Sequence, residues 1–175
     1  MVGTERPWTV PIRVEDVPET GRRVDLMADE STRASLAEAA GVNGVTRLEA
    51  TFDVTPHGRS GLHVLGGISA TVRQTCVVTL EPMSNEVIES IDLLFAPSAA
   101  QTNAGAELLP EGKNPLEPMV DGMVDLGAIA TEFLILGIDP YPRKPGAVFE
   151  PPQSGDGEAS PFAALAALKK NDRGT

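Results

Sequence analysis

Between residues 48 and 95 the chain alternates apolar and polar residues, and this alternation limits what it can fold into. Residues 48–55 show the pattern most cleanly, residues 62–80 continue it, and residues 87–95 repeat it after a turn at 82–85. A period of two residues is that of a β-strand with one buried face. Short turn sequences separate the stretches, so they predict neighbouring antiparallel strands, the last two forming a long hairpin.

Several residues add detail to this predicted sheet. Gly66 and Gly67 favour a bulge or a sharp bend within the second stretch. Alternate residues from Ile68 to Leu80, Cys76 among them, share its apolar face. Further strands are predicted at 8–14 and 24–28. The first should lie at a sheet edge, because Pro11 has no amide hydrogen to donate.

Two helices are predicted within the same part of the chain. The first covers residues 31–40, with Asp29 or Ser31 as its N-cap and Gly41 at its C-terminal end. The second runs from its cap Asp125 to about Gly137, with a broad apolar stripe that must pack on the sheet. No regular βαβ alternation occurs, so we expect an α+β fold with two or three helices. Its sheet should be twisted and mainly antiparallel, and either open or barrel-like.

The domain organisation follows from where these patterns stop. We expect a single α+β domain over residues 1–146, with a mobile loop near 97–118 that lacks any sustained periodicity. Residues 147–160 are predicted to be a polar linker, and residues 161–170 a short C-terminal helix. Phe162, Leu165 and Leu168 fall on one side of that helix. About ten residues do not hold a helix in water unaided, so it either docks or stays frayed.

The charge of the chain is unevenly distributed. The 25 acidic and 14 basic residues give a formal net charge of −11. Residues 81–139 alone hold 11 acids against one base, Lys113, a net charge of −10. This balance argues against a non-specific polyanion binder and predicts long-range attraction for a basic partner. The alternative is a solvated acidic face that only aids solubility.

The sequence offers little for catalysis. Cys76 is the only cysteine, which excludes an intrachain disulfide and a multi-cysteine zinc site. It lies on the apolar face of its strand, so we expect an inert core thiol with a raised pKa. His57 and His63 lack metal-ligand spacing, and a dyad with Cys76 has no third, orienting residue. The acids of residues 117–132 are expected to act structurally, at the positive end of a helix. We therefore predict no catalytic residue, no cofactor and no metal.

A candidate binding group follows the second predicted helix. Tyr141, Arg143 and Lys144 combine a planar ring with two cations, which together can stack on a base and hold a phosphate. Alternatively, the cations only offset the negative end of the helix. Lys169 and Lys170 repeat the pattern near the C-terminus, where a solvated tail is the alternative. No stretch approaches the roughly 20 apolar residues of a membrane span, and the N-terminus lacks a signal-peptide core, so we expect a cytoplasmic protein.

Several segments resemble the YceD family, the large ribosomal RNA subunit accumulation proteins of bacteria and plastids. They are WTVPI at 8–12, VPETG at 17–21, VRQTCVVTLEP at 72–82, VDLG at 124–127, EFL at 132–134, DPYPRKPG at 139–146 and SPFAAL at 160–165. Many family members carry two cysteines in the hairpin. Here Arg73 stands three residues before Cys76, so a metal or redox role is not carried over. Arg73 joins the candidate binding residues.

The resemblance implies a non-catalytic factor in ribosome assembly, needed for accumulation of large-subunit (23S) rRNA. Its expected partners are the pre-ribosomal large subunit, through large-subunit rRNA and/or a basic ribosomal protein, and no membrane. An alternative is a small-ligand binder or an unrecognised enzyme using a pocket in the curled sheet. That alternative requires a convergent set of ionisable groups in an apolar pocket.

Overall fold

The structure is a computed structural model that describes residues 6–97 and 116–149. Most of the loop predicted near 97–118 lies outside these ranges. So do nearly all of the predicted linker and the whole predicted helix at 161–170, with Lys169 and Lys170. The division into domain, linker and tail therefore stays a prediction.

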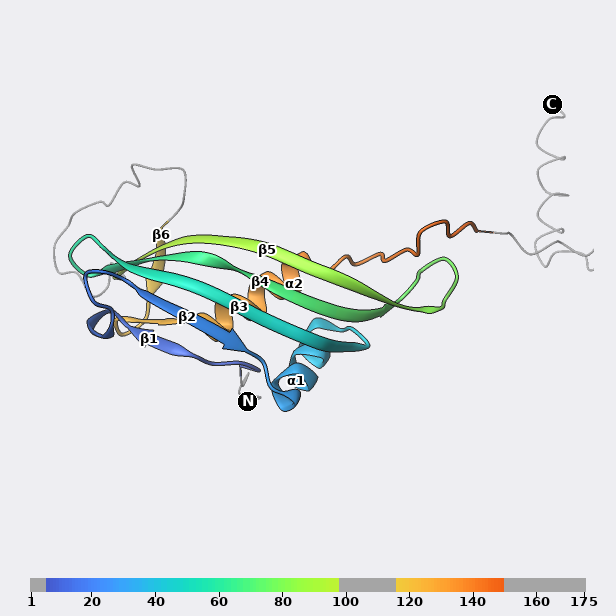
Figure 1. The fold of residues 1–175 in the computed structure, drawn as a ribbon, viewed down its shortest axis with the longest axis horizontal. Helices are drawn as coiled ribbons and strands as arrows, with labels where there is room; N and C mark the ends of the chain where they lie inside the picture. Colours follow the sequence, from blue (N-terminus) through green and yellow to red (C-terminus); the bar gives the residue numbers. More distant parts are fainter. Residues whose placement is uncertain (1–5, 98–115, 150–175) are drawn as a thin grey trace, which may run out of the picture.

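The main sheet confirms the α+β class and the predicted antiparallel arrangement. Its strand order is β2-β3-β4-β5-β6, antiparallel from β2 to β5, with β6 parallel to β5. The strands are β2 (Arg22–Met27), β3 (Gly44–His57), β4 (Gly61–Thr75), β5 (Pro82–Pro97) and β6 (Leu116–Met119). Figure 1 shows β2 to β5 running side by side as long, twisted strands.

A second, two-stranded sheet pairs the N-terminal region with the segment before the second helix. It joins β1 (Pro11–Arg13) to β7 (Met123–Asp125) in antiparallel register. A short 3-10 turn at Val14–Asp16 follows β1. The strand predicted at 8–14 is thus shorter than expected. Pro11 does stand on an edge strand, because both strands of a two-stranded sheet are edges.

Both predicted helices are present with the expected caps. In α1 (Glu30–Ala40), the Asp29 carboxylate accepts the Thr32 N–H at 2.7 Å, and Gly41 ends the helix in the left-handed conformation. In α2 (Leu126–Gly137), the Asp125 carboxylate accepts the Ala128 N–H at 3.1 Å. Of the part of the chain that the structure describes, neither helix is long and apolar enough to cross a membrane.

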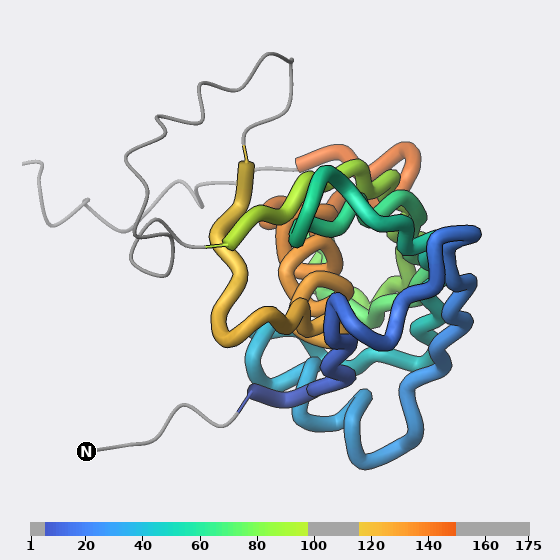
Figure 2. Tube along the Cα trace, turned by 90° about the vertical axis from the view of Figure 1, so that its left-hand side faces the viewer, coloured from blue at the N-terminus to red at the C-terminus, as the bar shows by residue number. Residues whose placement is uncertain are grey.

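The core lies between α2 and the concave face of the main sheet. Figure 2, seen along the strands, shows the sheet curling around α2. The barrel is not closed, because the strand order ends at β2 and β6, which do not pair. Most of the large, fully buried side chains come from α2 and the inner faces of β3 and β4, and include Phe52, Val54, Leu62, Val64, Val72, Leu126 and Leu134. Burial of each contributes about 1.5–3 kcal/mol.

The predicted turn of the long hairpin is wrong by several residues. Thr75 at the end of β4 pairs with Pro82, so β5 begins where the turn was expected. The chain turns at residues 76–81 instead, where Cys76 N–H donates to the Glu81 carbonyl and Leu80 N–H to the Cys76 carbonyl. Leu80 has a φ of +60° and is exposed, whereas Cys76 is buried. The turn ends the alternation that predicted a continuous apolar face.

The sequence predicts a bulge or a sharp bend at Gly66 and Gly67, and no bulge forms there. The β3–β4 register is continuous there, and the irregularity falls between Val45 and Arg47. The glycines instead allow close approach of neighbouring strands in the curled sheet. A Cβ on Gly66 would overlap the Thr51 carbonyl oxygen, and one on Gly67 would lie 2.8 Å from the Glu89 carbonyl oxygen.

This close approach predicts a large effect for a small substitution. We expect Gly66→Ala to lower the free energy of unfolding by about 2 kcal/mol or more, because the added methyl group meets backbone that cannot move aside. Urea denaturation measures the loss. The control is Leu65→Ala, at the neighbouring, partly exposed position. An unchanged midpoint for Gly66→Ala would show that the strands separate at no cost.

Candidate functional site

The segment that follows α2 is attached to the β4–β5 turn. Val77 N–H donates to the Pro142 carbonyl at 2.9 Å, and the Gln74 side-chain amide donates to the Asp139 carbonyl at 2.8 Å. Pro142 itself is buried. These bonds hold residues 139–147 against the hairpin, although the segment has no regular secondary structure.

The thiol of Cys76 lies at the centre of this attachment. Its Sγ accepts the Lys144 N–H at 3.4 Å and the Thr79 N–H at 3.5 Å. Hydrogen bonds from the Thr79 hydroxyl and then from these N–H groups lower the pKa of Cys76 from its ordinary value of 9.0 to about 6. The predicted burial of Cys76 is confirmed, but the predicted rise of its pKa is wrong. The donors stabilise the thiolate by more than the loss of solvent disfavours it.

The candidate binding residues of this segment separate into two kinds. Lys144 Nζ lies 2.7 Å from Glu81 Oε2, and this hydrogen bond lowers the pKa of the Glu81 carboxyl. Tyr141 is 71% exposed, and Arg143 is exposed with no ion-pair partner in residues 6–97 and 116–149. Lys144 therefore attaches the segment to the hairpin, while Tyr141 and Arg143 are available to a partner.

Arg73 lies in a different place from the other candidates. It stands on the outward face of β4 and lines a shallow depression of about 500 Å³ together with Arg33 of α1, Asn43 and Thr46. Arg33 was not among the residues predicted to bind, although it lies on the helix predicted over residues 31–40. These two cations form a patch separate from the segment at 139–147.

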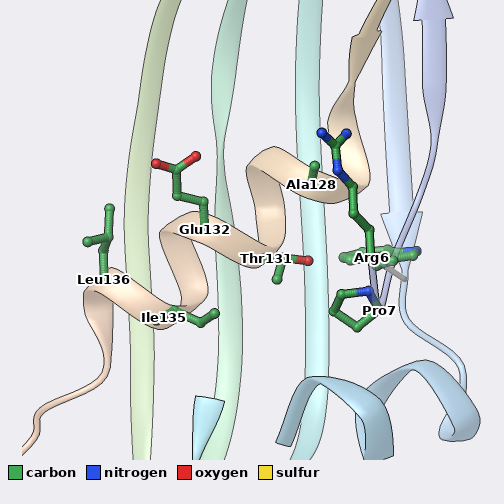
Figure 3. A pocket seen from close by; sticks show the side chains of 8 residues that line it. Arg6, Pro7, Ala128, Thr131, Glu132, Ile135 and Leu136 are labelled. Atoms are coloured by element: carbon green, nitrogen blue, oxygen red, sulfur yellow. The ribbon is translucent and has the colours of Figure 1, made fainter. Parts of the chain in front are cut away.

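A groove runs along the face of α2 that the sheet does not cover. Its apolar part, about 320 Å³, is lined by Pro7, Trp8, Ile135 and Leu136. Its wider part, about 550 Å³, includes Glu117, Asp125 and Glu132. Both parts share Arg6, Ala128 and Glu132, so they form one continuous groove. Figure 3 shows the side chains that line its apolar part.

The acids of this groove are only partly neutralised. Asp125 accepts the Val10 N–H at 2.8 Å and pairs with Arg6 at 3.3 Å. Its role is structural, as predicted, because it fixes the N-terminal segment to the start of α2. Glu117 and Glu132 have no ion-pair partner within the described ranges. Elsewhere Glu81, Glu86 and Asp92 pair with Lys144, Arg47 and His63. The groove therefore keeps negative charge that no ion pair within the described ranges offsets.

The residues considered for catalysis do not come together. His63 and Cys76 lie near opposite ends of β4, about 40 Å apart along the strand. The His63 ring pairs with Asp92 at 2.8 Å, and the rings of His57 and His63 are 6.5 Å apart. Over the residues that the structure describes, no group of three His, Cys, Asp or Glu side chains is arranged to hold a metal ion.

Comparison with known proteins gives one family match. The family described as large ribosomal RNA subunit accumulation protein YceD matches residues 64–169, which is more than half of the chain. The match contains the hairpin, α2, the segment after it and most of the predicted C-terminal helix. No curated protein and no solved structure matches the chain.

The bonds of Asp125 predict its contribution to stability. We expect Asp125→Ala to cost about 1–2 kcal/mol, because it removes the cap of α2 and the acceptor of the Val10 N–H. Thermal unfolding measures the loss. Asp125→Asn keeps an oxygen acceptor and should cost less. Equal losses for the two variants would mean that the Arg6 ion pair, not the cap, holds this site.

The lowered pKa of Cys76 predicts how stability depends on pH. The unfolded thiol titrates near 9 and the folded thiol near 6, so between these values the unfolded chain binds more protons. The stability of the wild type relative to Cys76→Ala should therefore rise with pH across this window and lose this increment as pH falls through about 6. Urea titrations of both proteins measure it. Parallel profiles would contradict the lowered pKa.

Proposed function

Because this chain belongs to the YceD family, we propose that it supports accumulation of large-subunit rRNA by binding a basic ribosomal protein during assembly of the large subunit. The family match supports the role in rRNA accumulation. Binding, without bond making or breaking, is our own assignment, as is a cytoplasmic location, where such assembly takes place.

One observation supports a basic partner. Two acids that have no ion pair within the described ranges, Glu117 and Glu132, line the same groove beside α2. Basic segments of ribosomal proteins carry the opposite charge, and a concave acidic surface attracts them at long range. Exposed carboxylates along such a groove also repel the phosphates of free RNA.

A second candidate is direct contact with RNA. It rests on Tyr141 and Arg143, which are exposed on a segment that hydrogen bonds fix to the hairpin. A fixed aromatic ring and an unpaired guanidinium suit stacking on a base and contact with a phosphate. The Arg33 and Arg73 patch adds two further cations.

Binding to large-subunit ribosomal proteins tests the proposal. We expect the variant Glu117→Gln/Glu132→Gln to bind them roughly two- to thirtyfold more weakly, because each of the two lost charge pairs contributes about 0.2–1 kcal/mol. The matched control, Glu19→Gln/Glu38→Gln, removes the same charge from exposed positions outside the groove lining. In cells lacking the protein, large-subunit rRNA should fall, and the groove variant should restore it less than the control does.

Two results would contradict this proposal. Equal binding by the groove variant and the control would exclude the acidic groove. Loss of binding to pre-rRNA in Tyr141→Ala/Arg143→Ala, with a reduced dependence on salt, would assign RNA as the partner instead. Normal levels of large-subunit rRNA in cells without the protein would overturn both candidates.

A further inference from the structure

The apolar part of the groove leaves part of α2 uncovered. Ile135 is 42% exposed and Leu136 is 71% exposed, beside Pro7 and Trp8. Figure 3 shows Ala128, Glu132 and Leu136 along one side of α2, with Thr131 and Ile135 on the adjacent side. A continuous apolar surface of this kind marks a site where another segment packs.

We propose that residues 161–170 of the same chain dock as a helix in this groove. Beyond the described ranges, residues 162–168 carry an apolar pattern at helical spacing, with Phe162, Leu165 and Leu168 on one side. The family match extends to residue 169, so it includes this segment together with α2. The inference does not depend on the proposed function.

The route of the chain allows this docking. Lys144 is held on the hairpin turn by its bond to Cys76, next to the start of β5 at Pro82. Val87, five residues or about 17 Å along β5, contacts Gly137 at the end of α2. Residues 150–160 span up to about 36–40 Å when extended. Residues 145–149 add at most about 18 Å to the distance that must be covered, so the extended tail still reaches the C-terminal end of α2.

Length and charge also match in one orientation. The groove follows α2 from Ala128 to Leu136, about 12 Å of helix axis, and residues 162–170 form a helix of about the same length. Entering at Leu136 and running antiparallel to α2, the tail places Phe162 on the apolar part. Lys169 and Lys170 then lie at the acidic part, where Glu132 has no ion pair within residues 6–97 and 116–149.

A photo-reactive benzoylphenylalanine in place of Phe162 tests the docking in the full-length chain. We expect an intramolecular cross-link to α2 near Leu136 or to the Pro7–Trp8 segment, identified by mass spectrometry of peptides. The same group at Ala167, on the opposite side of the predicted helix, should cross-link poorly. Leu136→Asp should lower the Phe162 yield about tenfold or more, since one buried leucine contributes at least that factor to a docking equilibrium.

The control for Leu136→Asp is Ile88→Asp, because Ile88 is 74% exposed on β5 and does not line the groove. It should leave the cross-link unchanged. A cross-link between two copies of the chain, a cross-link elsewhere on the domain, or none at all would each overturn the inference.

The fluorescence of Trp8 gives a second, independent measurement. Trp8 is the only tryptophan and lines the apolar part of the groove. We expect Leu165→Asp/Leu168→Asp to shift its emission to longer wavelength, because the tail no longer excludes water. Ala163→Asp/Ala167→Asp, with the same change of charge on the opposite side, should leave the emission as in the wild type. Equal emission from all three proteins would contradict docking.

Discussion

The packing of α2 into the concave face of the curled sheet determines most of this structure. The helix is apolar around much of its circumference, and the sheet covers one side of it. There Leu134 of α2 is buried in the same core cluster as Phe52 and Val64 of the sheet. Glycines 66 and 67 permit the close strand approach that the curl requires. Asp125 then fixes where α2 begins relative to the N-terminal segment. Because the sheet does not close, the remaining side of α2 becomes a groove.

A second set of contacts turns an irregular segment into a defined surface. Residues 139–147 contain prolines that exclude a helix, so their position comes from bonds to the hairpin turn alone. Cys76 contributes most when ionised, since its sulfur accepts N–H groups from both sides of the contact. This arrangement explains why the single cysteine of the chain is held in a buried position. It also explains why Lys144 is structural while its neighbours Tyr141 and Arg143 remain exposed.

Much of the fold could be predicted from the sequence, because alternation and caps are local signals. Asp29, Gly41 and Asp125 marked the helix ends correctly. The hairpin turn was misplaced because Cys76, Val78 and Leu80 continue the alternation although the chain already turns. Gly66 suggested a bulge because sequence does not show how closely a neighbouring strand approaches. The pKa of Cys76 was predicted in the wrong direction, since its donors include Lys144, which is distant in sequence. The groove depends on how α2, β6 and the N-terminal segment meet, so no local pattern could predict it.

The electrostatics of the fold favour a role in binding. Acids on the outer face of the sheet are neutralised within the chain, as with Glu86 by Arg47, so they contribute little field at a distance. Glu117 and Glu132 are not neutralised by their neighbours in the groove. An apolar groove with unpaired carboxylates suits a segment that is apolar on one side and basic at one end. The chain's own residues 161–170 have that character, with Phe162, Leu165 and Leu168 on one side and Lys169 and Lys170 at one end. A partner that binds the acids of the groove therefore contacts the same carboxylates as residues 161–170. The partner and the tail compete for the uncovered side of α2.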